Sequence, residues 1–588
     1  MARKTDKSSR NLAQSEVGTI RKNWHGRLKV ALVYPNKYHV GMSNLGFQTL
    51  YDLLNRIEHV VCERLFLPDD AGSHTGRLLT VESQRPLSDF DIIAFSVSFE
   101  NDYPHLLTIL EKAGLPLRSS DRANPHPLVI AGGVSFFTNP EPIADFIDCF
   151  LIGEAEPMLA PFFDTVSLDL LGQDRRALLE ALARNVPGLY VPAFYQALYN
   201  PNGTLKAFEP TADVPAVIKR MFVKDLSGTP TCSVVVTPDT TFKQKYLIEV
   251  SRGCVHGCRF CSTGFIYRPP RFRPPALLNE CLETGSSICN RIGLVGAAVS
   301  DLPQIDKLCS QVLQTDTQLS FSSLRADALS PELLAVLRQS NVKTATIAPD
   351  AGSARLRTVI NKGISEEDIL NAAETLVANN IPNLKLYFMV GLPTETTEDV
   401  EAIVRLCKKI KHCFLKSSRA RKRIGEITVS LNSFVPKPHT PFQWFGMDDI
   451  PALKTKIKHV KNGLKKTANV QVHADIPRWS YIQGLLSRGD RRVSQILVLA
   501  HQNQGNWPQT FKASALNSDF YVLRERALDE LLPWDFIDHG IEKSFLAREY
   551  KRALKGKPSP PCPITDCTIC GVCQEPNNEL TMLKGRLI

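Results

Sequence analysis

Residues 252–261 read Arg252-Gly253-Cys254-Val255-His256-Gly257-Cys258-Arg259-Phe260-Cys261, directly after a short apolar, strand-like run at 246–250. Three and two residues separate the three cysteines. Thiolates are soft ligands that hold iron–sulfur clusters. Most [4Fe-4S] clusters use four cysteines, so three leave one iron open to a small molecule. The alternative is a structural zinc loop, in which His256 would have to be the fourth ligand at an unfavourable spacing.

Residues 245–450 around this loop alternate strand-like and helix-like runs. The pattern predicts six parallel strands, at 246–250, 292–299, 319–324, 344–347, 384–390 and 426–432. A helix is expected over 365–378, with Ser365 as its N-cap and acidic residues in its first turn. Functional groups on parallel barrels lie at the carboxyl ends of the strands, so the residues after each strand are the candidates for a site.

The cysteine loop, with Phe260 directly before its third cysteine, resembles the radical S-adenosylmethionine (SAM) superfamily. The stretches Gly391-Leu392-Pro393-Thr394-Glu395-Thr396 and 434–442 resemble it as well. The resemblance implies a partial (β/α)6 barrel and a [4Fe-4S] cluster on Cys254, Cys258 and Cys261, whose open iron binds SAM. One electron, from a donor such as flavodoxin or ferredoxin, then cleaves SAM to methionine and a 5′-deoxyadenosyl radical.

The resemblance also assigns cofactor-binding positions at the strand ends. Small residues after the second strand permit close backbone approach to SAM, although the usual glutamate is missing there. Arginine suits the SAM carboxylate because its donors form a fork. Asp350 has helix capping as an alternative role, and Glu395 either caps the next helix or orients its loop. The expected cofactor-binding residues are Phe260, Gly296, Ala297, Ser323, Arg325, Asp350, Gly391 and Glu395. No catalytic residue beyond the cluster ligands is assigned.

Residues 27–160 predict a doubly wound, flavodoxin-like parallel sheet, with strand patterns at 28–34, 91–97, 128–133 and 146–153. The segment resembles the cobalamin-binding-like domain of one branch of radical SAM proteins. Ligands of such sheets lie beyond the carboxyl ends of the strands. The Asp-x-His-x-x-Gly motif of histidine-ligated cobalamin is missing from 28–160. Two alternatives stay open, namely cobalamin binding and a degenerate domain used for packing or substrate recognition.

A second group of cysteines lies near the end of the chain, in a proline-rich stretch. Cys562, Cys567, Cys570 and Cys573 have the spacing Cx4Cx2Cx2C. One interpretation is a second [4Fe-4S] cluster, because Cx2Cx2C resembles a ferredoxin run. A second is a structural zinc site closed by four thiolates, and a third is a set of unligated cysteines.

Length and composition predict several domains in one α/β chain. At 588 residues, with 43% hydrophobic and 22% charged residues, the sequence is typical of a globular protein. We expect a disordered N-terminus (1–26), the cobalamin-binding-like domain (27–160), a bridging segment (161–244), the barrel (245–450), a helical region (451–555) and a cysteine-rich tail (556–588). No apolar run approaches the ~18–20 residues that span a bilayer. The N-terminus is polar, so a cytoplasmic location is expected.

The net charge of +10 gathers partly between residues 405 and 466. This basic region is either an RNA contact or a solvated face. The sequence therefore predicts a radical SAM enzyme acting on an unidentified substrate. A cobalamin-dependent methyltransferase, an enzyme that modifies RNA or a protein, and a non-catalytic iron–sulfur binding or assembly protein are the alternatives.

Overall fold

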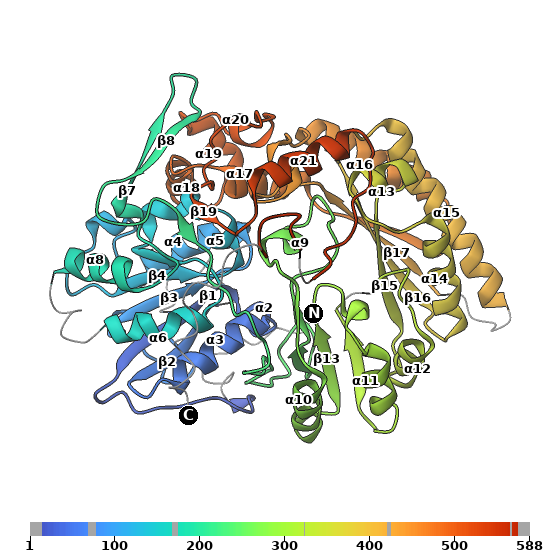
Figure 1. Cartoon of the computed structure of the whole chain (residues 1–588), viewed down its shortest axis with the longest axis horizontal. Helices are drawn as coiled ribbons and strands as arrows, with labels where there is room; N and C mark the ends of the chain where they lie inside the picture. Colours follow the sequence, from blue (N-terminus) through green and yellow to red (C-terminus); the bar gives the residue numbers. More distant parts are fainter. Residues whose placement is uncertain are drawn as a thin grey trace.

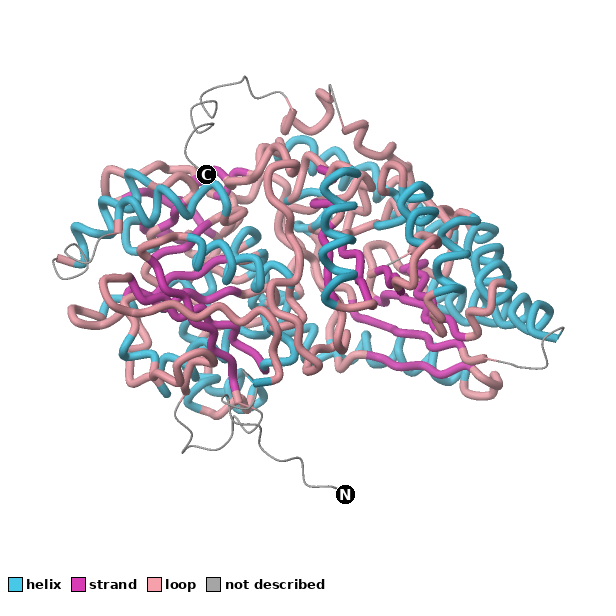
Figure 2. The backbone as a smooth tube through the Cα atoms, turned by 90° about the horizontal axis from the view of Figure 1, so that it is seen from below, coloured by secondary structure: helices cyan, strands magenta, loops and turns pink. Residues whose placement is uncertain are grey.

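The computed structural model describes residues 14–68, 78–166, 174–322, 324–419, 425–564 and 567–573. Ser323, one of the expected cofactor-binding residues, lies outside them. The chain forms two lobes, an N-terminal lobe around one sheet and a barrel lobe, with the C-terminal helices packed along one side of both (Figure 1). The view from below separates the strands of the two lobes clearly (Figure 2).

The N-terminal lobe contains a six-stranded sheet with the order β2-β1-β3-β4-β5-β6. Its strands are β1 (Leu28–Lys37), β2 (Val60–Leu67), β3 (Ile92–Ser96), β4 (Leu128–Gly132), β5 (Cys149–Leu151) and β6 (Leu189–Tyr190). The first five run parallel in the order of a flavodoxin-like sheet, and β6 is antiparallel to β5. The expected doubly wound fold is confirmed.

The sequence did not predict β2, because Glu63 and Arg64 interrupt its apolar run. Both side chains are buried. Arg64 forms ion pairs with Glu16 at 2.6 Å and with Glu82 at 2.7 Å. Buried charges persist where they are paired in this way, and the pairing is not visible in the local pattern.

The helices of this lobe lie on both sides of its sheet (Figure 1). They are α2 (Tyr38–Gly41), α3 (Leu45–Arg56), α4 (Tyr103–Lys112), α5 (Val134–Thr138), α6 (Glu156–Thr165) and α8 (Arg175–Asn185). The lobe continues past residue 160, because α8 and β6 belong to it. Beyond them, β7 (Tyr195–Tyr199) and β8 (Leu205–Pro210) form an antiparallel ribbon, and β9 (Ile218–Lys219) pairs with β19 (Ile537–Asp538).

The barrel lobe consists of parallel strands in two sheets. The first has the order β10 (Tyr246–Glu249), β13 (Arg291–Val295), β14 (Gln318–Phe321). The second has the order β15 (Thr344–Asp350), β16 (Asn383–Val390), β17 (Ile427–Ser433), β18 (Val470–Ala474). All six expected strands are present, and β18 extends the sheet into the region expected to be helical.

Helices cover the outside of these strands (Figure 1). They are α10 (Pro275–Ile288), α11 (Ile305–Val312), α12 (Pro331–Gln339), α13 (Ala354–Val359), α14 (Glu366–Ala378), α15 (Thr397–Arg419) and α16 (Ile450–Leu464). Ser365 caps α14, as predicted, and Asp368 completes a capping box.

The C-terminal region is mainly helical, as expected. Its helices are α17 (Pro477–Arg488), α18 (Val493–Gln502), α19 (Trp507–Ala513), α20 (Asp519–Val522) and α21 (Lys543–Leu554). Short 3-10 turns connect elements throughout, at Leu87–Asp89, Glu100–Asp102, Ser119–Asp121, Glu141–Phe146, Pro192–Phe194, Val299–Asp301 and Pro441–Trp444. In the described part of the chain, every helix is too short or too polar to cross a bilayer.

Candidate functional site

The cysteine loop follows β10, the first strand of the barrel, and extends beyond the end of that strand. The antiparallel pair β11 (Ser251–Arg252) and β12 (Arg271–Phe272) closes the base of the loop. The short helix α9 (Thr263–Ile266) follows the third cysteine. Gly253 has φ +85°, and a Cβ there would lie 2.8 Å from the Tyr267 carbonyl oxygen. A glycine is therefore required where the chain turns into the loop.

Cys254, Cys258 and Cys261 lie together and carry free thiols. The three lie within electrostatic range of one another, and the Cys261 N–H donates to the Cys258 carbonyl at 3.0 Å. Burial raises the pKa of the Cys258 thiol to about 12. A buried thiol with so high a pKa needs a cation or a metal to become a thiolate.

Two basic side chains supply positive charge to this loop. Lys362 lowers the cost of a thiolate at Cys258, and Arg325 has the same effect at Cys254. Lys362 pairs with Asp350 at 2.6 Å, and Arg325 pairs with Asp327 at 2.8 Å. The arrangement of free thiols beside partly buried cations fits an anionic iron–sulfur cluster.

Asp350 lies at the end of β15 with φ +61°. Burial raises the pKa of this carboxyl, and the charge of Lys362 opposes the effect. The side chain of Ser353, rather than Asp350, caps α13. Asp350 therefore anchors Lys362 beside Cys258, and its helix-capping alternative is wrong.

His256 forms a short contact with another acidic residue. Its Nε2 lies 2.5 Å from Oδ2 of Asp301. This contact holds the imidazole of His256 beside a carboxylate. Among the described side chains, no three histidine, cysteine or acidic groups converge at the spacing of a single metal ion.

The remaining expected positions lie in two places. Gly296 packs so closely that a Cβ would lie 2.8 Å from Ser251 Oγ, and with Ala297 it lines an interlobe cavity. Glu395 accepts a hydrogen bond from the Gly391 N–H at 2.8 Å and pairs with Lys456 at 2.7 Å. Burial raises the pKa of Glu395, opposed by Lys456. Glu395 therefore orients its own loop.

Phe260 belongs to neither place. It packs against the apolar cluster that contains Phe265 and Trp444. The residues expected to bind the cofactor are thus not all brought together. Gly296 and Ala297 reach the cavity, Arg325 and Asp350 lie by the thiols, and Gly391 and Glu395 shape a turn.

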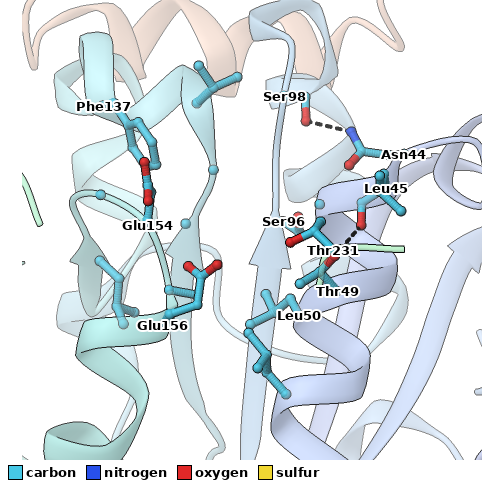
Figure 3. Close-up of a pocket in the computed structure, with 18 of the residues that line it drawn as sticks. Asn44, Leu45, Thr49, Leu50, Ser96, Ser98, Phe137, Glu154, Glu156 and Thr231 are labelled. Atoms are coloured by element: carbon cyan, nitrogen blue, oxygen red, sulfur yellow. Dashed lines mark hydrogen bonds between the residues drawn. The ribbon is translucent and has the colours of Figure 1, made fainter. Parts of the chain in front are cut away.

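The cavity has a volume of about 610 Å³ and lies between the two lobes. The N-terminal lobe lines it at the carboxyl ends of β3, β4 and β5, and the barrel lines it with residues next to the cysteine loop. Figure 3 shows Asn44, Ser96 and Ser98 on one side and Glu154 and Glu156 on the other. The lining is mostly apolar, with hydroxyl, amide and carboxylate groups at intervals, as in many small-molecule and cofactor sites.

A buried ion network joins this cavity to the cysteine loop. Glu154 pairs with Arg252 at 2.7 Å and with Arg271 at 2.6 Å, and these arginines stand on β11 and β12. Glu156 pairs with Arg252 at 2.7 Å. Burial alone would raise the pKa of Glu154, but hydrogen bonds and charge from Arg271 and Arg252 outweigh it and lower the pKa. The network locks the base of the loop to the end of the N-terminal sheet.

Sequence reasoning missed Lys362, Asp301 and the role of Glu154. Only the Glu154-Ala155-Glu156 run after a predicted strand was a local signal for the network. The others lie far along the chain from the cysteines and meet them only in the fold.

Two family models match the chain. The model described as radical SAM proteins, N-terminal, matches residues 46–192. The model of the radical SAM superfamily matches residues 248–407, which include all three cysteines of the loop.

Relatives match over very different lengths. The uncharacterized protein MJ0966 of Methanocaldococcus jannaschii is 32% identical over 88% of this chain and 98% of its own length. The uncharacterized methyltransferase PH0819 of Pyrococcus horikoshii is 23% identical over 28% of this chain and 37% of its own. Among solved structures, the methyltransferase TsrM from Kitasatospora setae with cobalamin and a [4Fe-4S] cluster covers 83% of this chain and all of its own. That match has 13% identity and a TM-score of 0.47.

The family supplies the chemistry that the loop geometry fits. A radical SAM enzyme uses a [4Fe-4S] cluster and SAM, and here Cys254, Cys258 and Cys261 are the free thiols placed to hold that cluster. From its cysteine loop, its barrel and the full-length match to MJ0966, the chain belongs to the radical SAM superfamily.

Proposed function

We propose that this radical SAM enzyme is a methyltransferase that binds cobalamin in the cavity between its lobes. The observation that carries the proposal is the position of the cavity. One wall is the carboxyl edge of a flavodoxin-like sheet, where such sheets bind ligands, and the other contains Gly296 and Ala297 beside the cysteine loop. A ligand on the sheet would therefore face SAM. Cobalamin, when bound, supplies methyl-transfer chemistry, and the cluster with SAM supplies one-electron chemistry.

The wall on the N-terminal side fits a large ligand with many amide groups. Gly132 leaves space at the end of β4, because a Cβ there would meet only the Leu151 carbonyl oxygen, at 3.8 Å. Asn44 donates to Ser98 Oγ at 2.9 Å, so an amide and a hydroxyl stand together at the rim. No histidine lines the cavity among the described residues, so cobalamin would bind there without a histidine ligand from this part of the chain.

The remaining residues have supporting roles in this proposal. Lys362 and Arg325 favour thiolates at the cluster ligands. Glu154 holds the base of the cysteine loop next to the cavity through Arg252. The apolar lining excludes water from the space between cobalamin and SAM, which protects reactive species there from side reactions. A low-potential protein such as flavodoxin or ferredoxin would donate the electron. All fifteen cysteines are free, which suits a reducing compartment such as the cytoplasm.

The test is cobalamin retention by the anaerobically reconstituted protein. The substitution Gly132→Leu fills the cavity at a position with ordinary backbone geometry. We expect it to abolish cobalamin binding, measured by visible absorbance after desalting, and to leave the iron content unchanged. Gly228→Leu is the matched control, because a Cβ at Gly228 meets no atom within 4 Å. A wild-type protein that retains no cobalamin would contradict the proposal.

RNA is a second candidate substrate class, supported by the basic surface of α15 and α16. Both helices carry exposed lysines, namely Lys408, Lys409, Lys416, Lys454, Lys458 and Lys461. In Figure 1, α15 lies at the outer edge of the barrel lobe, far from the N-terminal lobe. If RNA binds there, its affinity should fall steeply between about 50 and 200 mM salt. A salt-independent affinity, or no binding at low salt, would remove this candidate.

A further inference from the structure

The segment that leads into the cysteine-rich tail packs directly against the SAM-binding cysteine loop. Arg259, between two ligand cysteines, has no exposed side-chain surface. Its Nη2 donates to the Lys557 carbonyl at 2.7 Å and to Ser559 Oγ at 3.0 Å. It also pairs with Glu549 of α21 at 3.0 Å. Its Nη1 donates instead to the Val359 carbonyl at 2.9 Å, so Arg259 joins the loop, the barrel and the start of the tail.

Two further contacts join the loops through the backbone. The Cys562 N–H donates to the Val255 carbonyl at 2.7 Å, so a tail cysteine lies beside the residue that follows Cys254. Asn361 bridges the two segments, because its Nδ2 donates to the Gly257 carbonyl at 3.1 Å and its Oδ1 accepts from the Ser559 N–H at 2.8 Å. Figure 1 shows the red C-terminal segment beside α9, at the centre of the molecule.

The four tail cysteines lie near one another. Cys573 lies within electrostatic range of Cys562, Cys567 and Cys570, and all four are free. Cys567 and Cys570 are buried. The Ile569 N–H points at Cys567 Sγ at 3.4 Å, a backbone donor positioned for a thiolate.

The far side of the tail loop is fixed to the C-terminal region. The Cys570 carbonyl accepts from the Glu542 N–H at 2.9 Å. Gly571 turns the loop at φ +98°, where other residues would be strained. The loop is therefore held at both ends, which favours a preorganised ligand set.

We propose that Cys562, Cys567, Cys570 and Cys573 bind a second [4Fe-4S] cluster, and that this cluster relays electrons to the one on Cys254, Cys258 and Cys261. The relay rests on the proposed radical chemistry, whereas the tail cluster stands by itself. Four thiolates complete its coordination, so no iron is left open for SAM. Redox exchange, rather than substrate binding, is the chemistry that remains to it.

The two loops lie in the order that a relay requires. Cys573 and the side chain of Ile569 face solvent, Cys562 contacts the inner loop, and Cys258 is buried beyond it. One electron passes from a low-potential donor protein to the tail cluster, and the tail cluster is reoxidised when that electron moves to the inner cluster. No bond forms or breaks in the tail during this transfer.

The first test is the metal content of the full chain after anaerobic reconstitution. We expect about eight irons per wild-type chain, and about four in the Cys567→Ser/Cys570→Ser variant. Cys258→Ala should also leave about four, held by the tail. Cys413→Ser, on α15, is the control and should keep about eight. A tail variant with unchanged iron, or one that loses a single zinc ion instead, would overturn the proposal. The tail iron can be counted even if the wild type never cleaves SAM.

The second test separates relay from structure by changing the reductant. With dithionite, which reaches the inner cluster directly, the tail variant should cleave SAM at the wild-type rate. With reduced flavodoxin its rate should fall about tenfold or more. The double variant changes two buried cysteines and could lose activity by misfolding. Cys573→Ser, which changes an exposed cysteine, is therefore measured beside it. Equal losses with both reductants, or no loss with flavodoxin, would contradict a relay.

Discussion

Cys258 is enclosed by the barrel, whereas Cys573 is exposed at the end of the tail. The inner loop is closed by β11 and β12, locked by Glu154, and neighboured by Lys362 and Arg325. The tail loop contacts the inner loop through Arg259 and Cys562, is bridged to it by Asn361, and is held on its far side by Glu542. Distant parts of the chain position the inner loop, whereas the tail loop is held between the inner loop and the C-terminal region.

The largest expected effect comes from removing an inner ligand. Cys258→Ala should reduce formation of 5′-deoxyadenosine from SAM and dithionite to background, because three thiolates are needed to present the open iron. The tail should keep its iron. The measurement is anaerobic product analysis beside iron quantification. Wild-type levels of 5′-deoxyadenosine in this variant would contradict the assignment of SAM cleavage to the inner loop.

The next largest effect concerns the scaffold of the inner loop. Glu154→Gln leaves Arg271 buried without its carboxylate, whereas Arg252 keeps its ion pair with Glu156. We expect a loss of about 3–5 kcal/mol in the free energy of unfolding. Because the folded-state pKa of Glu154 is lowered, its contribution is present above its ordinary pKa near 4.5 and is lost as pH falls below it.

Denaturant unfolding of both proteins from pH 7 to pH 3 measures this difference. The difference in the free energy of unfolding between wild type and Glu154→Gln should become smaller below about pH 4.5. Glu180→Gln, which breaks the exposed pair with Arg176, is the control and should change stability by less than about 1 kcal/mol. A gap that widens in acid would show that Glu154 is not held as a carboxylate.

The features that could be predicted from the sequence are those set by residues close together in the chain. The cysteine spacings, the parallel strands of both lobes and the cap at Ser365 depend on neighbouring residues. Lys362 and Glu154 could not be assigned, because each meets the loop only after distant strands have packed. Likewise β18 lies after the expected end of the barrel. In β2, the charged residue Arg64 is paired with Glu82, which lies later in the chain. Long-range pairing decided these elements.

A smaller effect is expected from the charge beside the inner thiols. Asp350→Asn with Lys362→Met removes a partly buried ion pair, in which Lys362 acts on the Cys258 thiol more strongly than Asp350 does. The inner cluster should become harder to reduce, and a tenfold change in the ratio of reduced to oxidised cluster corresponds to about 59 mV for one electron. Redox titration followed by electron paramagnetic resonance (EPR) measures this shift. The potential of the tail cluster should stay constant, and equal shifts in both would contradict the assignment.

The smallest effect should come from the bridge between the loops. Asn361 has φ +54°, so Asn361→Gly keeps the backbone conformation while removing both side-chain hydrogen bonds. We expect both clusters to remain and flavodoxin-driven SAM cleavage to fall a few-fold, with the dithionite rate unchanged. Asn379→Gly, at the end of α14, is the control. Loss of either cluster in Asn361→Gly would show that the bridge is structural.

The EPR spectrum of the reduced wild-type protein, recorded with and without SAM, tests the central difference most directly. Only the inner cluster has an open iron, so we expect SAM to shift one of two overlapping cluster signals and to leave the other unchanged. The signal that shifts should be missing from Cys258→Ala, and the constant signal should be missing from Cys567→Ser/Cys570→Ser. A spectrum in which SAM shifts neither signal, or shifts both, would contradict the division of roles between the two cysteine loops.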